Sequence, residues 1–159
     1  MSWHAYAVDT AEMAGLNPLL VKAIAQVESA WNTWAARYEP LFSYYYHAPE
    51  MADQLGLSVE TEKACQRTSW GLLQIMGGVA RERGFRDHLT QLCDPMLGLK
   101  YGCAQLKWLS QFAREEAELI AMYNGGRGAR ERMPSGMFRN QRYVDKVCKE
   151  LNELRKLKG

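Results

Sequence analysis

The chain has 159 residues, 47% of them hydrophobic and 24% charged, and a formal net charge of +2. This length fits one domain over residues 1–159, and the composition is ordinary for a globular protein. The charge is too small to argue for nucleic acid, and no apolar run is long enough for stable insertion into a membrane.

Helical periodicity dominates the first third of the chain. A helix is predicted over residues 3–14, closed by Gly15, and a second one begins at Asn17-Pro18, an N-cap followed by proline. An aromatic stretch over residues 33–47 lacks this period and is predicted to be irregular. Two short helices are predicted near residues 49–55 and 58–66. The apolar face of the helix that begins at Asn17-Pro18 is formed by Leu20, Ala23, Ile24 and Val27.

The second half of the chain is also predicted to be helical. Residues 71–83 have a helix-like apolar side, which Gly77-Gly78 weakens. Asp94-Pro95 repeats the cap-plus-proline start and opens a long helix, and residues 115–123 form another that ends at Asn124-Gly125-Gly126. A loop over 127–137 leads to a final helix. With no convincing β-hairpin signal, internal repeat or linker, the predicted fold class is all-α, mainly helical.

Cysteine and histidine patterns give no support for a metal centre or a redox motif. No C-x-x-C pair and no H-E-x-x-H spacing occurs, so we expect no metal and no cofactor. Residues 1–10 lack the basic flank and apolar segment of a secretory signal, which favours free, partly buried thiols. The four cysteines are Cys65, Cys93, Cys103 and Cys148.

Four short segments carry candidate chemistry, the last of them Tyr143-Val144, early in the final helix. Glu28 ends an apolar helix, where desolvation would favour its protonated form and suit it to act as a general acid. Gln74 offers an amide that can hydrogen-bond sugars, and Tyr123-Asn124 precede two glycines that let a ligand approach the backbone. Each segment alone is more often purely structural.

Taken in order, these motifs resemble the soluble lytic transglycosylases. The motif residues are Glu28-Ser29, Ser69 with Gly71-Leu72-Leu73-Gln74, Tyr123-Asn124, and Tyr143. The resemblance covers about residues 17–147, and segments 37–40, 92–95 and 101–103 look like those of compact phage-encoded members. It implies a lysozyme-like helical fold with a peptidoglycan-binding groove, glycan strands as the partner and a monomeric state.

The resemblance also implies residue roles. Glu28 would be the catalytic acid/base, which protonates the oxygen between N-acetylmuramic acid and N-acetylglucosamine and leaves a 1,6-anhydro sugar. Gln74, Tyr123 and Asn124 would bind the glycan in the groove. Tyr143 would close the groove near Glu28, and Ser29 and Ser69 would support the site.

Two departures from the family pattern stand out. The segment between Glu28 and Gly71 is longer than in compact members, and the excess is aromatic. Many members carry Glu-Thr shortly before the final tyrosine, whereas residues 138–142 read Phe-Arg-Asn-Gln-Arg here. A polar contact of the family is therefore missing or replaced.

Two other functions remain open on the sequence. A hydrolytic lysozyme would need a second carboxylate, for which Glu39 is the candidate. Asp94 is explained as a helix cap, and Glu60 and Glu62 are interpreted as surface charges. A non-catalytic wall-binding or virion structural domain is the other alternative. Without a signal peptide, we expect synthesis in a host cytoplasm and action on the wall after phage lysis, or carriage on a virion.

Overall fold

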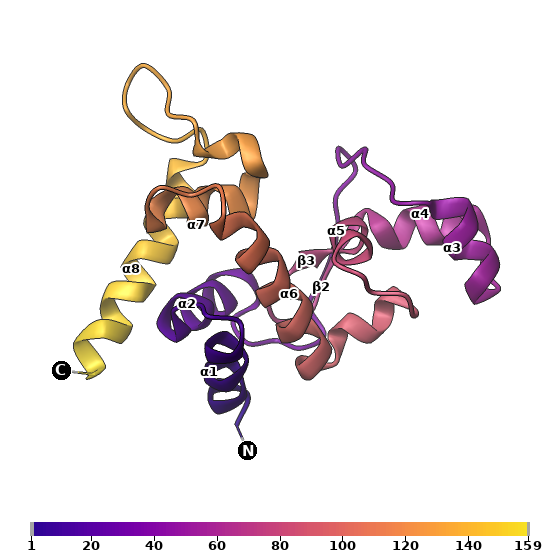
Figure 1. Cartoon of the computed structure of the whole chain (residues 1–159), viewed down its shortest axis with the longest axis horizontal. Coiled ribbons are helices and arrows are strands. Elements are labelled where there is room, and N and C mark those ends of the chain that lie inside the picture. Colours follow the sequence, from indigo (N-terminus) through magenta and orange to yellow (C-terminus); the bar gives the residue numbers. More distant parts are fainter. Residues whose placement is uncertain (1, 159) are drawn as a thin grey trace. The chain divides into compact units, whose positions relative to one another are not determined.

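The computed structural model describes residues 2–158 and is mainly helical, as the sequence predicts (Figure 1). In chain order the elements are α1 (Trp3–Met13), α2 (Pro18–Ser29), β1 (Ala36–Tyr38), α3 (Ala48–Leu55), α4 (Val59–Gln66), β2 (Thr68–Trp70), β3 (Ile75–Met76), α5 (Gly77–Glu82), η1 (Leu89–Cys93), α6 (Pro95–Ser110), α7 (Glu116–Gly125), η2 (Arg127–Arg130) and α8 (Gln141–Lys158). The two η elements are short 3₁₀ helices.

The chain divides into two compact units. The terminal unit comprises Met1–Val27 with Cys103–Gly159, and the central unit comprises Glu28–Gly102. The divisions fall inside α2 and α6, so Glu28 and Ser29, the last residues of α2, belong to the central unit. One catalytic domain over residues 1–159 stays a prediction, and each unit is described by itself.

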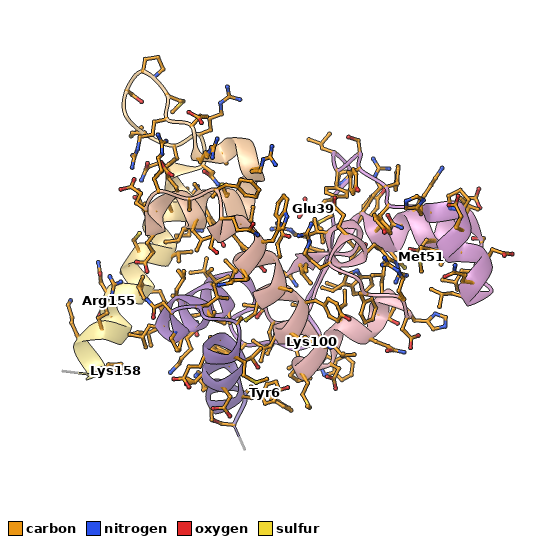
Figure 2. All side chains as sticks on the ribbon, viewed as in Figure 1. Tyr6, Glu39, Met51, Lys100, Arg155 and Lys158 are labelled. Atoms are coloured by element: carbon orange, nitrogen blue, oxygen red, sulfur yellow. The ribbon has the colours of Figure 1, made fainter. Side chains whose placement is uncertain are left out.

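Helix starts in the terminal unit follow the predicted capping. The Asn17 side chain accepts the backbone N–H of Leu19 at 3.0 Å, which satisfies a free donor at the start of α2. The carboxylate of Glu116, at the start of α7, accepts from Asn17 and from Arg155 of α8, which Figure 2 labels. The core side chains include Leu20, Ala23, Ile24, Leu106, Leu109, Leu119, Ile120, Val144, Val147 and Leu151.

The central unit contains a small antiparallel sheet of order β1-β2-β3, which the sequence did not predict. Ala36 pairs with Trp70 across β1 and β2, and Trp70 pairs with Ile75 across β2 and β3. The predicted helix over residues 71–83 is therefore wrong in its first half, and α5 begins only at Gly77. Gly71 and Gln74, with φ of +70° and +48°, are left-handed and turn the chain into a hairpin.

Two glycines let this hairpin turn pack tightly against the segment that follows it. A Cβ on Gly71 would lie 2.3 Å from the Leu92 carbonyl oxygen at the end of η1, and one on Gly102 of α6 would lie 2.4 Å from Leu73. Neither position has room for a side chain. Gly71 also has a positive φ, which glycine adopts more easily than other residues do. Glycine at both positions therefore fixes the turn in place.

A buried charge pair organises the helical side of the central unit. Glu62 of α4 and Arg81 of α5 are both fully buried and form two hydrogen bonds, of 2.9 and 3.0 Å. The Gln66 amide donates to Glu62 at 2.8 Å, and Arg81 also donates to the carbonyl of Phe85. The interpretation of Glu62 as a surface charge is wrong, because the pairing with Arg81 makes its burial possible.

The aromatic segment after β1 is fastened to the end of α4. The side-chain amide of Gln66 accepts the Tyr46 N–H at 2.7 Å and donates to the Tyr46 carbonyl at 2.9 Å. Arg67 donates to the backbone carbonyls of Pro40 and Phe42. Every one of these bonds is made to the main chain of the segment, so α4 defines its path.

The four cysteines are free, as predicted. Cys93 and Cys103 are buried, Cys65 and Cys148 are half-buried, and burial raises the pKa of the Cys103 thiol to about 12. None of the helices within residues 2–158 is both long and apolar enough to cross a membrane.

Candidate active site

Glu28 lies in the last turn of α2, at the start of the central unit, and is half-buried. Directly after this turn, Ala30 and Trp31 have φ of +48° and +63°, a left-handed conformation that is costly for residues other than glycine. The helix thus ends abruptly, and such local strain is concentrated at functional sites.

Ser29 joins the end of α2 to the hairpin turn. Its hydroxyl donates to the Leu72 carbonyl oxygen at 2.8 Å. Leu72 lies in the turn between β2 and β3, whose position Gly71 fixes against η1. Because Ser29 follows Glu28 directly, this hydrogen bond ties the backbone of the candidate acid to a rigid part of the unit.

Gln74 holds the same turn from within. Its amide nitrogen donates to the carbonyl oxygens of Ala35 and Gly71, at 2.9 and 3.0 Å. Its amide oxygen accepts the hydroxyl of Ser69 at 2.9 Å. Both amide protons are therefore used inside the protein, and only a lone pair on Oε1 remains for a sugar hydroxyl.

Glu39, the candidate second carboxylate, follows β1 in the central unit and is labelled in Figure 2. Its side chain is 34% exposed and pairs with the guanidinium of Arg37. Its backbone N–H donates to the Arg67 carbonyl at 2.7 Å. The carboxylate is thus partly screened from water and already has a cationic partner.

The other predicted ligand-binding residues belong to the terminal unit. Tyr123 and Asn124 lie in the last turn of α7, and Tyr143 lies in the first turn of α8. Asn124 is exposed, whereas the two tyrosines are half-buried. The chain turns after Asn124 at Gly126, whose N–H closes the helix on the Met122 carbonyl at 2.8 Å.

Asn140 is a further candidate residue, because it contacts the candidate residue Asn124 directly. Its amide nitrogen donates to the Ala121 carbonyl at 2.9 Å and to the Asn124 side-chain oxygen at 3.0 Å. These bonds fix the oxygen end of the Asn124 amide and leave the NH₂ end of Asn124 as a donor. Asn140 stands in the stretch that departs from the family's Glu-Thr, so that departure was the available signal.

The structure thus describes two sets of candidate residues, one in each unit. Glu28, Ser29, Glu39, Ser69 and Gln74 belong to the central unit, and Tyr123, Asn124 and Tyr143 belong to the terminal unit. In the central set, the Glu28 carboxyl group lies at the end of α2, which is hydrogen-bonded to the turn between β2 and β3; a carboxyl group in such a fixed position suits proton transfer. The terminal set offers an oriented amide and phenol rings, which suit a neutral polar ligand such as a sugar.

Comparisons with known proteins give one finding. The family model described as "Transglycosylase SLT domain" matches residues 5–140, which include every candidate residue except Tyr143. A comparison with curated proteins gave no match.

Proposed function

The chain belongs to the transglycosylase SLT family of peptidoglycan-cleaving enzymes, and we propose that Glu28 is its catalytic acid/base. The proposed reaction cuts the bond between N-acetylmuramic acid and N-acetylglucosamine and leaves 1,6-anhydro-N-acetylmuramic acid. The observation that carries this assignment is the position of Glu28: a half-buried residue at the end of α2, next to Ser29, whose hydrogen bond to Leu72 anchors the backbone there.

The proposed chemistry needs only one carboxyl group. Glu28 gives its proton to the glycosidic oxygen, the bond to C1 breaks, and positive charge develops on the muramic ring. The ionised Glu28 then takes the proton from the C6 hydroxyl of the same sugar as that oxygen bonds to C1. Glu28 is protonated again at the end, and no water is consumed.

The other site residues take supporting or binding roles in this proposal. Ser29 and Ser69 brace the turn, and Gln74 braces it too, because both its amide protons bond to backbone carbonyls. Gln74 could therefore only accept a hydrogen bond from a sugar hydroxyl, and could not donate one. The exposed Asn124 amide is the best placed donor, with Tyr123 and Tyr143 as the aromatic contacts.

Mass spectrometry of the released muropeptides tests the reaction. Purified peptidoglycan should yield sugars lighter by one water than hydrolysis products, and Glu39→Gln should leave this product and its rate within about twofold. Products of hydrolytic mass that Glu39→Gln abolishes would instead make the enzyme a lysozyme with two carboxylates. No product from several wall types would favour a non-catalytic wall-binding or virion domain.

Loss of the Asn140 side chain should weaken the site through Asn124. Asn140→Ala removes the bond that orients the Asn124 amide, and one such bond is worth about 1.4 kcal/mol, or about tenfold in kcat/KM. Asn140→Asp should lower kcat/KM further, because a carboxylate would face the oxygens of Asn124 and Ala121. Rates of wall lysis measure this effect. The control is Asn152→Ala, which removes an exposed amide from α8. Equal lysis rates for all these variants would refute the positioning role of Asn140.

The setting we propose is bacteriophage lysis or a virion-borne enzyme that acts on the wall as a monomer. It is supported by the resemblance of segments 37–40, 92–95 and 101–103 to phage-encoded members. Lysis of sensitive cells from outside by the purified protein, and its mass by light scattering, test these two points.

A further inference from the structure

The terminal unit has a pocket beside the Asn124 amide. It has a volume of about 530 Å³ and lies where α7, η2 and the loop that follows η2 meet the start of α8. This loop is the open orange curve in Figure 1. Gly125 and Asn140 line the pocket, and these same residues adjoin or bond Asn124. A ligand held at Asn124 would therefore be next to the pocket.

The pocket is positively charged. Residues 127–142 contain five arginines and one acidic residue, Glu131. Arg132, Arg139 and Glu131 all line the pocket, so cations outnumber the single carboxylate on its wall, and Glu131 is also paired with Arg130. Arg132 is paired with Glu115, but Arg139 is exposed and has no ion pair or hydrogen bond within residues 2–158. Arg139 is thus a cation on the pocket wall without an internal partner.

The pocket is also shaped by fixed groups. Arg132 donates to the Gly136 carbonyl at 2.8 Å and lies 4.1 Å from the ring centre of Phe138, which is buried. The loop is closed by pairing between Arg132 and Phe138. Met133 and Pro134 add an apolar wall. A guanidinium on a wall with apolar neighbours suits a small carboxylate-bearing group with short alkyl parts.

We propose that this pocket binds a carboxylate of the peptide carried by the glycan strand, with Arg139 as its main ligand. The proposal rests on the proposed function and adds a substrate preference to it. The sugars of the strand are neutral apart from the lactyl group, which carries the peptide, so the peptide is the nearest source of carboxylates. A strand bound at Asn124 would present that peptide beside the pocket.

Two substrates and three variants test the proposal. Walls freed of phosphate polymers are used intact or after an amidase has removed the peptides and the lactyl carboxylates that this cleavage exposes have been methylated. Arg139→Gln should raise KM about 5- to 10-fold on peptide-bearing strands and change it less than twofold on bare strands. Arg139→Lys should give a KM between those of the wild type and Arg139→Gln, because lysine keeps the charge but lacks the forked pair of guanidinium donors. Lys146→Gln, which removes an exposed charge from α8, is the matched control.

Direct binding separates this proposal from the catalytic one. N-acetylmuramyl tripeptide should bind the wild-type protein in a calorimetric titration, and its carboxyl-methylated form or Arg139→Gln should bind at least fivefold more weakly. Equal binding of both forms, or an equal loss on bare and peptide-bearing strands, would overturn the pocket assignment. An effect of Arg139→Gln seen only on walls that retain phosphate polymers would also overturn it. An inactive wild-type protein that still binds the peptide would refute the proposed catalysis and leave the pocket standing.

Discussion

Replacement of Glu28 by glutamine is expected to lower kcat for glycan cleavage by about 10²- to 10⁴-fold, the usual contribution of a positioned general acid. Glutamine has the same shape and keeps hydrogen-bonding atoms, but it has no proton to give at neutral pH. KM should change little, because the loss falls on the transition state. Release of soluble muropeptides from purified walls measures the rate.

Two comparisons make this result specific. Glu60→Gln removes an exposed carboxylate from α4 of the same unit and should leave kcat unchanged. The melting temperature of Glu28→Gln should stay near that of the wild type, which shows that the fold is intact. A Glu28→Gln protein with more than about a third of wild-type activity would refute the assignment of the catalytic acid.

Replacement of Glu62 by glutamine should destabilise the central unit by about 3–5 kcal/mol. The change leaves Arg81 charged, fully buried and without its carboxylate partner. For a chain of this size, such a loss lowers the melting temperature by roughly 10 °C. Circular dichroism during thermal unfolding and urea titration measure it.

The matched control for this pair is again Glu60→Gln, which should shift stability by less than about 0.5 kcal/mol. The double variant Glu62→Leu with Arg81→Met should recover much of the loss, because it removes both charges together. Equal stability of Glu62→Gln and wild type would mean that water reaches Arg81 and that the pair has no structural role.

Helix starts and ends were predictable because their signals are local. Asp94 precedes proline, and its side chain accepts the N–H groups of Met96 and Leu97 at 2.9 and 3.0 Å, as a cap does. Asn17 repeats this arrangement at α2. The order of the motifs along the chain likewise predicted the family, which the match over residues 5–140 confirms.

The missed features depend on contacts between residues that are distant in sequence. Strands β2 and β3 have three and two residues, too few to show the alternating pattern of a strand. Glu62 lies in a polar helix, and its partner Arg81 is 19 positions away, so nothing local marks it as buried. The bond between Asn140 and Asn124 spans 16 positions, and its one sign in the sequence was the departure from the family's Glu-Thr at residues 138–142.

The aromatic segment after β1 offers a place to diversify the protein. The hydrogen bonds that Gln66 and Arg67 make to it all go to backbone atoms, so they do not depend on the identity of the side chains at the contacted carbonyls. Leu41 is 95% exposed, and Ser43 is exposed as well. Mutations at these two positions can accumulate at little cost in stability, in nature or in a combinatorial library, while the surface presented to solvent changes.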